Sequence, residues 1–207
     1  MPQTAGSSTD SQPRFYYDLA SPESYLVAER ALHAVGEVPE WIPVSFGSPA
    51  FRCAEEVASY QEDVARRAAA LGVMPIRWPE PFPVSDITWA TLAATYAKWI
   101  GRGVAFSLAA LRQAFAAGRD LSQVDNVLVA AAACELHPRA VLKGIESRSV
   151  EERLRATSEA AAARGVIGLP AIGARGRLFQ GERVADAARK ELFGGFEDER
   201  GGGPSTD

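Results

Sequence analysis

The sequence predicts an α/β fold in which a strand–helix–strand unit and a strand–strand–helix unit are separated by a long run of helices. Three observations support this prediction. Residues 15–46 contain a short aromatic segment, a helix with a well-formed start and a second apolar segment. Residues 51–164 are rich in alanine and show helical periodicity without an internal repeat. Residues 165–193 begin with glycine and proline and place two short apolar segments around an Arg-Gly turn.

The first unit covers residues 15–50. Phe15-Tyr16-Tyr17-Asp18-Leu19 is an aromatic run typical of a strand. The next helix starts at Ser21-Pro22-Glu23-Ser24 and stops at Gly36, because serine is a good N-cap, proline suits the first helical position and an acidic residue suits the first turn. The segment Trp41–Phe46 predicts a second strand, parallel to the first and reached by a right-handed crossover.

Residues 51–164 predict an inserted helical subdomain. Helical periodicity recurs in six segments: 54–71, 86–102, 105–117, 122–136, 138–147 and 150–164. The proline-rich stretch 77–83 is expected to be a loop. Its residues Trp78 and Phe82 either belong to the core, which is the interpretation we favour, or lie over a binding pocket.

The second unit covers residues 165–193. Ala171–Ala174 and Arg177–Gln180 are short apolar segments joined by Arg175-Gly176, which predicts a hairpin, and a last helix is expected from Val184 to Phe193. The order βαβ, helices, ββα is that of a thioredoxin-like fold with a helical insertion. Residues 1–14 and 194–207 are polar or glycine-rich without an apolar stretch, so we expect a disordered arm and a disordered tail.

Composition excludes several classes of protein. The 207 residues are 47% hydrophobic and 23% charged, as in ordinary globular proteins, and are enough for a sizeable core. The net charge is −4 and the 22 lysines and arginines are scattered, which argues against nucleic-acid binding. No segment resembles a secretion signal or a membrane span of about 18 apolar residues. We therefore expect a cytoplasmic protein that acts on a small molecule, away from membranes.

Cysteine and histidine are scarce. The two cysteines, Cys53 and Cys134, and the two histidines, His33 and His137, have no metal-ligand spacing, and no Cys-x-x-Cys motif is present. We expect no metal site, and dithiol redox chemistry loses its simplest support. Both cysteines are interpreted as small packing residues and His137 as a residue at a helix end or in a loop.

Ser21 is the first candidate for chemistry. A helix start of this kind is common and by itself needs no function. The turn nevertheless follows the first strand of a parallel pair, at the sheet edge where open α/β folds bind ligands. Free N–H groups at a helix start stabilise anions, including thiolates. Because no histidine lies nearby in the sequence to act as a base, we expect Ser21 to donate a hydrogen bond to a thiolate and not to act as a nucleophile.

The second candidate is Gly168-Leu169-Pro170. This tripeptide is either a plain turn or a bend at a cis proline, because proline cannot pair inside a central strand but can begin one. A bend would leave the backbone N–H and C=O of Leu169 free to pair with an extended peptide. Glutathione is such a peptide.

Together these features resemble the 2-hydroxychromene-2-carboxylate isomerases and the kappa-class glutathione transferases, within the DsbA-like branch of the thioredoxin superfamily. The matching segments follow the family's order through nearly the whole chain: 15–26, 77–83, 105–106, 115–120, 163–170 and 178–183.

The resemblance implies an isomerase of small aromatic or unsaturated keto acids that depends on glutathione or a similar low-molecular-weight thiol. In this interpretation Ser21 orients and activates the thiol sulfur, and Leu169 and Pro170 bind the tripeptide backbone. Glu182 and Arg183 would hold its γ-glutamyl end. Relatives are commonly dimers, so the resemblance also implies that the chain can form a homodimer.

Other functions stay open. A kappa-type transferase would conjugate small electrophiles at the same site. A non-catalytic DsbA-like binding protein is favoured by Glu23, where the family usually has an aromatic or apolar residue, because a carboxylate would oppose a thiolate unless it points to solvent. A dithiol oxidoreductase has the least support, because Ser21 and Ser24 occupy both positions of the redox cysteines.

Overall fold

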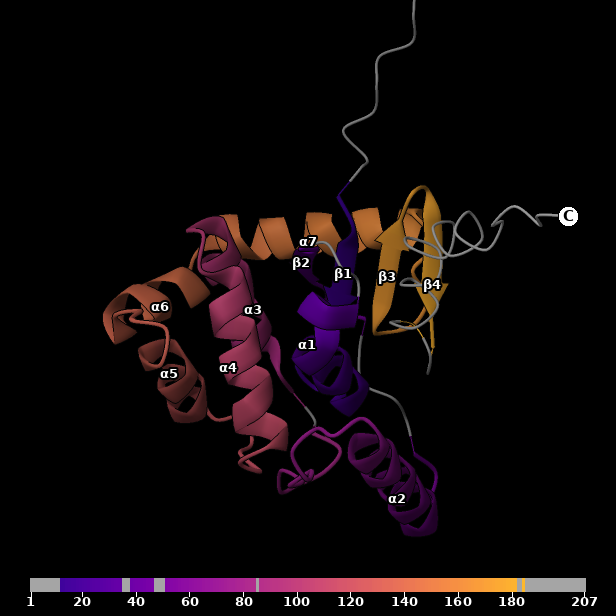
Figure 1. The fold of residues 1–207 in the computed structure, drawn as a ribbon. Coiled ribbons are helices and arrows are strands. Elements are labelled where there is room, and N and C mark those ends of the chain that lie inside the picture. Colours follow the sequence, from indigo (N-terminus) through magenta and orange to yellow (C-terminus); the bar gives the residue numbers. More distant parts are fainter. Residues whose placement is uncertain (1–11, 35–37, 47–50, 85, 182–183, 185–207) are drawn as a thin grey trace, which may run out of the picture.

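The computed structural model describes residues 12–34, 38–46, 51–84, 86–181 and 184. A four-stranded sheet lies between helix α1 on one face and helix α7 on the other, and helices α3 to α6 gather beside it (Figure 1). None of the described helices is both long and apolar enough to cross a membrane. The fold is the thioredoxin-like arrangement that the sequence predicts.

The sheet is mixed and has the strand order β2-β1-β3-β4. Strand β1 pairs in parallel with β2 and antiparallel with β3, which in turn pairs antiparallel with β4. In this register Tyr16 lies opposite both Ile42 and Ala171, so β3 begins beside the end of β1. The strands span Arg14–Tyr17 (β1), Glu40–Pro43 (β2), Ala171–Ala174 (β3) and Arg177–Gln180 (β4).

Strand β1 contributes aromatic rings to the hydrophobic clusters on both faces of the sheet. Phe15 and Tyr17 pack in the main core with residues of helix α1 (Pro22–Ala34), whereas Tyr16 packs on the other face with Ala161 of α7. This alternation follows from the period of two along a strand. The strand ends at Tyr17 and not at Leu19 as predicted, because the chain turns at Asp18 to begin α1.

Six helices follow between β2 and β3 in the part of this stretch that the structure describes. They are α2 (Ala54–Ala70), α3 (Thr88–Trp99), α4 (Gly103–Phe115), α5 (Val124–Ala132), α6 (Pro138–Ile145) and α7 (Arg148–Ala163). Each predicted helix of this region is confirmed, with ends displaced by a few residues. Helix α3 lies at the centre of this group of helices, and its small side chains allow neighbouring helices to pack closely against it. A Cβ atom at Gly144 of α6 would lie only 2.5 Å from the ring of Tyr96 in α3.

Several predictions concern single residues. Cys134 is buried, as expected of a packing residue, but the same prediction is wrong for Cys53, which is exposed just before α2. His137 lies at a helix end, as predicted: it caps α6, and its Nδ1 accepts the N–H of Arg139 at 3.2 Å. Of the helix predicted over 184–193, only the buried Val184 belongs to the described residues.

Candidate functional site

Ser21 is the N-cap of helix α1. Its Oγ accepts the backbone N–H of Ser24 at 2.9 Å, which satisfies one of the donors that a helix start leaves without a partner. The residue is 7% exposed. Because α1 follows β1 directly, this turn lies at the carboxyl end of β1, at the edge where β3 begins.

Asp18 supports the turn from inside the protein. Its Oδ1 accepts the backbone N–H of Ser21 at 2.8 Å. Burial raises the pKa of the Asp18 carboxyl to about 7, and the nearby charge of Glu23 acts in the same direction. Asp18 is not among the predicted site residues, although an acidic residue three positions before a serine N-cap is a local signal for this contact.

Glu23 connects Ser21 to helix α2. Its Oε2 accepts hydrogen bonds from Ser21 Oγ at 3.3 Å and from the Tyr60 hydroxyl at 2.6 Å, and its Oε1 accepts one from Arg67 at 2.9 Å. The side chain is only 21% exposed, so it does not point to solvent. Nothing in the sequence indicated Tyr60 or Arg67, which belong to a helix far along the chain.

Aromatic side chains surround a small pocket beside Ser21. Tyr60 stacks on Phe82 with ring centroids 6.1 Å apart, and Phe51 packs against both rings. Burial, together with the charge of Glu23, raises the pKa of Tyr60, which keeps the phenol neutral. Trp78 packs against the main core and also contacts Phe82. The proline-rich loop therefore contributes side chains to both the core and the pocket. The pocket is lined by Ala20, Ser21, Phe51, Tyr60, Phe82, Pro83 and Val84.

The Leu169–Pro170 peptide bond is cis, so the bend expected before β3 is present. Within the described part of the chain, no hydrogen bond involves the backbone N–H or C=O of Leu169. Gln180 of β4 holds the segment that leads to this bend. Its Oε1 accepts the N–H groups of Ile167 at 2.9 Å and Gly168 at 3.1 Å, and its Nε2 donates to the Gly165 carbonyl at 3.1 Å.

The remaining predicted site residues, Glu182 and Arg183, lie outside the described residues. Within the described ranges, no three histidine, cysteine, aspartate or glutamate side chains come together as a metal site would require. The Oγ of Ser24 is buried and has no hydrogen-bond partner in the described part of the chain.

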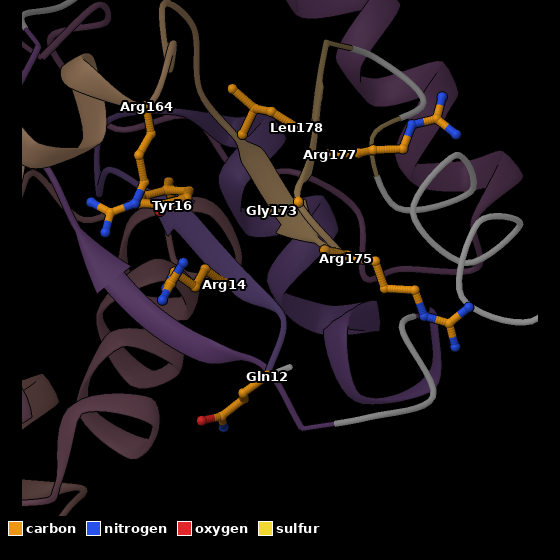
Figure 2. Close-up of a pocket in the computed structure, with 10 residues that line it drawn as sticks. Gln12, Arg14, Tyr16, Arg164, Gly173, Arg175, Arg177 and Leu178 are labelled. Atoms are coloured by element: carbon orange, nitrogen blue, oxygen red, sulfur yellow. The ribbon is translucent and has the colours of Figure 1, made fainter. Parts of the chain in front are cut away.

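A larger cavity, of about 170 Å³, lies at the opposite edge of the sheet, where the β3–β4 hairpin turns beside the start of β1. Arg14 and Arg164 lie on the side of Tyr16, whereas the side chains of Arg175 and Arg177 point the other way (Figure 2). Arg14 also lies 3.8 Å from a carboxylate oxygen of Glu40. This cavity is separate from the Ser21 turn because the two lie at opposite ends of β1.

Near Ser21 and its hydroxyl group lie the carboxyl groups of Asp18 and Glu23 and the N-terminus of α1. The aromatic rings of Phe51, Tyr60 and Phe82 line the adjoining pocket. The helix N-terminus attracts an anion or the lone pair of a sulfur, and the carboxyl groups can hold or accept protons. The open backbone at Leu169 suits an extended peptide.

Comparison with known proteins is consistent with this fold. Residues 14–193 match the family of DSBA-like thioredoxin domains. Among solved structures, 2-hydroxychromene-2-carboxylate isomerase shares 17% identity with a TM-score of 0.77, covering 90% of this chain and 98% of that one. A probable DsbA oxidoreductase from Streptomyces coelicolor shares 18% identity with a TM-score of 0.73, covering 95% of this chain and 94% of that one.

The cytosolic disulfide reductase DsbM from Pseudomonas aeruginosa, solved with GSH, shares 15% identity with a TM-score of 0.63, covering 90% of this chain and 99% of that one. At these identities the solved structures establish the fold alone. No curated protein gives a significant match. Because the family match spans nearly the whole chain, the protein belongs to the family of DSBA-like thioredoxin domains.

Proposed function

We propose that this protein is a thiol-dependent isomerase that uses glutathione, or a low-molecular-weight thiol of the same class, to act on small aromatic or unsaturated keto acids. The observation that carries this proposal is the position of the Ser21 hydroxyl at the start of α1, at the same sheet edge as the cis Leu169–Pro170 bond. The fold shared with 2-hydroxychromene-2-carboxylate isomerase and with a reductase solved with GSH supports it.

The described residues fit such a thiol. The backbone N–H and C=O of Leu169 have no hydrogen-bond partners within the described ranges and are suited to an extended peptide backbone. Ser21 offers a hydroxyl oxygen for contact with the sulfur. A bound thiol supplies reversible addition to a carbon–carbon double bond, which can then rotate while it is single.

The protein's own residues would bind and orient the substrate. The rings of Phe51, Tyr60 and Phe82 line a pocket of only about 10 Å³ beside Ser21, so a planar aromatic group would lie against their apolar surface and not inside the pocket. We therefore propose that these three rings contact the substrate and that Ser21 contacts the sulfur of the thiol.

A disulfide oxidoreductase function, as in several structural neighbours, is disfavoured. Ser21 and Ser24 stand where such enzymes need a pair of cysteines, and a hydroxyl group cannot form a disulfide. Reduction of insulin by this protein above the uncatalysed rate would contradict this assignment.

Calorimetry with glutathione at millimolar concentration is the first test. We expect the wild-type protein to bind it, and the Ser21→Ala variant to bind it and to lose isomerisation of an unsaturated aromatic keto acid. Absence of binding by glutathione and by other small thiols would refute the proposal. Conjugation of a chlorinated nitroaromatic compound without isomerisation would identify a kappa-type transferase, and peptide binding that does not depend on a thiol would identify a binding protein.

A further inference from the structure

The carboxylate of Glu23 is held directly beside Ser21. Two hydroxyl groups and one guanidinium donate hydrogen bonds to it, from Ser21 at 3.3 Å, Tyr60 at 2.6 Å and Arg67 at 2.9 Å. Arg67 also forms an ion pair with Asp63, with 2.9 Å between Nε and Oδ2. Because both carboxylate oxygens are engaged, Glu23 has a fixed position relative to the Ser21 hydroxyl.

The hydroxyl of Ser21 is therefore already engaged in two hydrogen bonds, one as donor and one as acceptor. A serine hydroxyl has one proton and two lone pairs. Its proton is donated to Glu23, and one lone pair accepts the N–H of Ser24 at 2.9 Å. In this state Ser21 can accept a hydrogen bond from the S–H group of a thiol, but it has no proton left to donate to a thiolate.

The charges that face Ser21 also favour a neutral thiol. The carboxylate of Glu23 lies beside the hydroxyl. Asp18 accepts the Ser21 N–H, and because burial raises the pKa of Asp18 to about 7, this carboxyl is only partly charged near neutral pH. The positive charge of Arg67 is shared between Glu23 and Asp63, and Tyr60 contributes a neutral phenol. The full charge of the Glu23 carboxylate opposes the formation of an anion beside it more strongly than the partial positive charge of the α1 N-terminus favours one, so the site disfavours a thiolate that exists before the reaction.

We propose that the site binds its thiol in the neutral form and that Glu23 accepts a proton, through Ser21, while the sulfur adds to the substrate. Ser21 Oγ takes the S–H proton as it gives its own proton to Oε2 of Glu23. The sulfur–carbon bond forms, the electron pair of the double bond moves onto the keto group, and the negative charge passes from Glu23 to the keto oxygen. Both proton transfers reverse when the sulfur–carbon bond breaks, so no oxidant or reductant is needed.

This inference rests on the proposed function, and it assigns Glu23 a positioning and proton-accepting role that acts through Ser21. It predicts two opposite effects when Glu23 loses its charge: the bound thiol forms a thiolate more easily, and kcat falls. Removing a carboxylate beside the sulfur makes a thiolate easier to form. Removing the proton acceptor slows the reaction, by about 10²-fold for general bases of this kind.

The test uses Glu23→Gln, which keeps the size of the side chain and one of its two hydrogen-bond acceptor atoms while removing its charge. The fraction of bound glutathione in the thiolate form is followed by ultraviolet absorbance as the pH is raised, and kcat is measured in parallel. Glu29→Gln is the matched control, because Glu29 is another partly buried glutamate of α1 with an arginine partner, Arg112 at 2.6 Å. Glu23→Asp is the conservative variant that retains the proton acceptor.

We expect Glu23→Gln to bind glutathione, to form the thiolate at a pH about one unit lower and to lose about 10²-fold in kcat. Glu29→Gln should match the wild type in both properties, and Glu23→Asp should keep the wild-type thiolate midpoint and recover part of kcat. A kcat for Glu23→Gln that is unchanged, or that rises with the thiolate fraction, would overturn the inference. So would an unchanged thiolate midpoint. If the wild-type protein binds no thiol, the proposed function itself fails, and this is visible before any variant is made.

Discussion

The carboxyl group of Asp18 accepts the backbone N–H of Ser21 at 2.8 Å while lying almost entirely inside the protein. The hydrogen bond fixes the turn between β1 and α1, and with it the direction of the Ser21 hydroxyl. The same burial makes Asp18 a carboxyl whose protonation differs between the folded and unfolded states, because burial raises its pKa to about 7 in the folded protein.

Asp18→Asn should therefore change how stability depends on pH. Between pH about 4 and about 7 the folded state holds a proton on Asp18 that the unfolded state has lost, so the free energy of unfolding falls as the pH rises through this window. A shift of about three pKa units corresponds to at most about 4 kcal/mol. The neutral asparagine still accepts the Ser21 N–H, so the variant should be more stable than the wild type at pH 8 by a few kcal/mol in urea unfolding.

Asp86→Asn is the matched control for this prediction. The Asp86 carboxylate also accepts a backbone N–H, that of Thr88 at 2.8 Å, but it is exposed, and hydrogen bonding by the Thr88 side chain and backbone lowers its pKa. Its replacement should give no gain at pH 8. Equal stabilisation by both substitutions would contradict the role given to burial.

Ser21 and His137 both cap helices, and only Ser21 lies at the candidate site. Replacement of either by alanine removes a side-chain acceptor from a helix start, which costs about 1 kcal/mol. We expect comparable losses of stability in Ser21→Ala and His137→Ala, measured by denaturant unfolding. Only Ser21→Ala should impair thiol-dependent isomerisation; equal impairment in the two variants would show that helix fraying explains the effect.

The hydroxyl groups of Tyr17 in β1 and Ser107 in α4 form a buried hydrogen bond, and burial raises the pKa of Tyr17. Ser107→Ala leaves the tyrosine hydroxyl buried without a partner, which costs about 1–3 kcal/mol. Tyr17→Phe should cost less, because a serine in a helix can donate to a carbonyl one turn earlier. The double variant should lose less than the two single losses added together in a double-mutant cycle; strict additivity would show that the bond contributes nothing.

Gln180 is expected to control the segment that precedes the cis bond. Ile167 is 89% exposed, so the protection of its amide depends on the hydrogen bond to Gln180. Gln180→Ala should accelerate amide hydrogen exchange at Ile167 and Gly168 by about tenfold or more, because a lost hydrogen bond of about 1.4 kcal/mol corresponds to that factor. Gln180→Glu keeps both acceptor interactions and should retain most of the protection. Unchanged exchange in Gln180→Ala would mean that the backbone alone orders this segment.

Local signals in the sequence were sufficient for much of the fold and for part of the site. The Ser-Pro-Glu start indicated the cap of α1, because capping depends on residues within one turn. Pro170 at the start of a strand indicated the bend, since a proline cannot take part in a central ladder. The order of strand and helix periods indicated the thioredoxin-like topology, which few arrangements of these elements satisfy.

Only the tertiary structure decided what surrounds Ser21. Tyr60 and Arg67 contact Glu23 although they lie 37 and 44 residues away from it in the sequence. The periodicity of α2 does not indicate which residue of another helix its polar side chains will contact. The sequence left open whether Glu23 points to solvent, because a first-turn glutamate is favourable to the helix dipole in either direction. The packing of α2 against the start of α1 turned it toward Ser21. Contacts of this kind depend on the relative placement of whole elements, which local propensities leave undetermined.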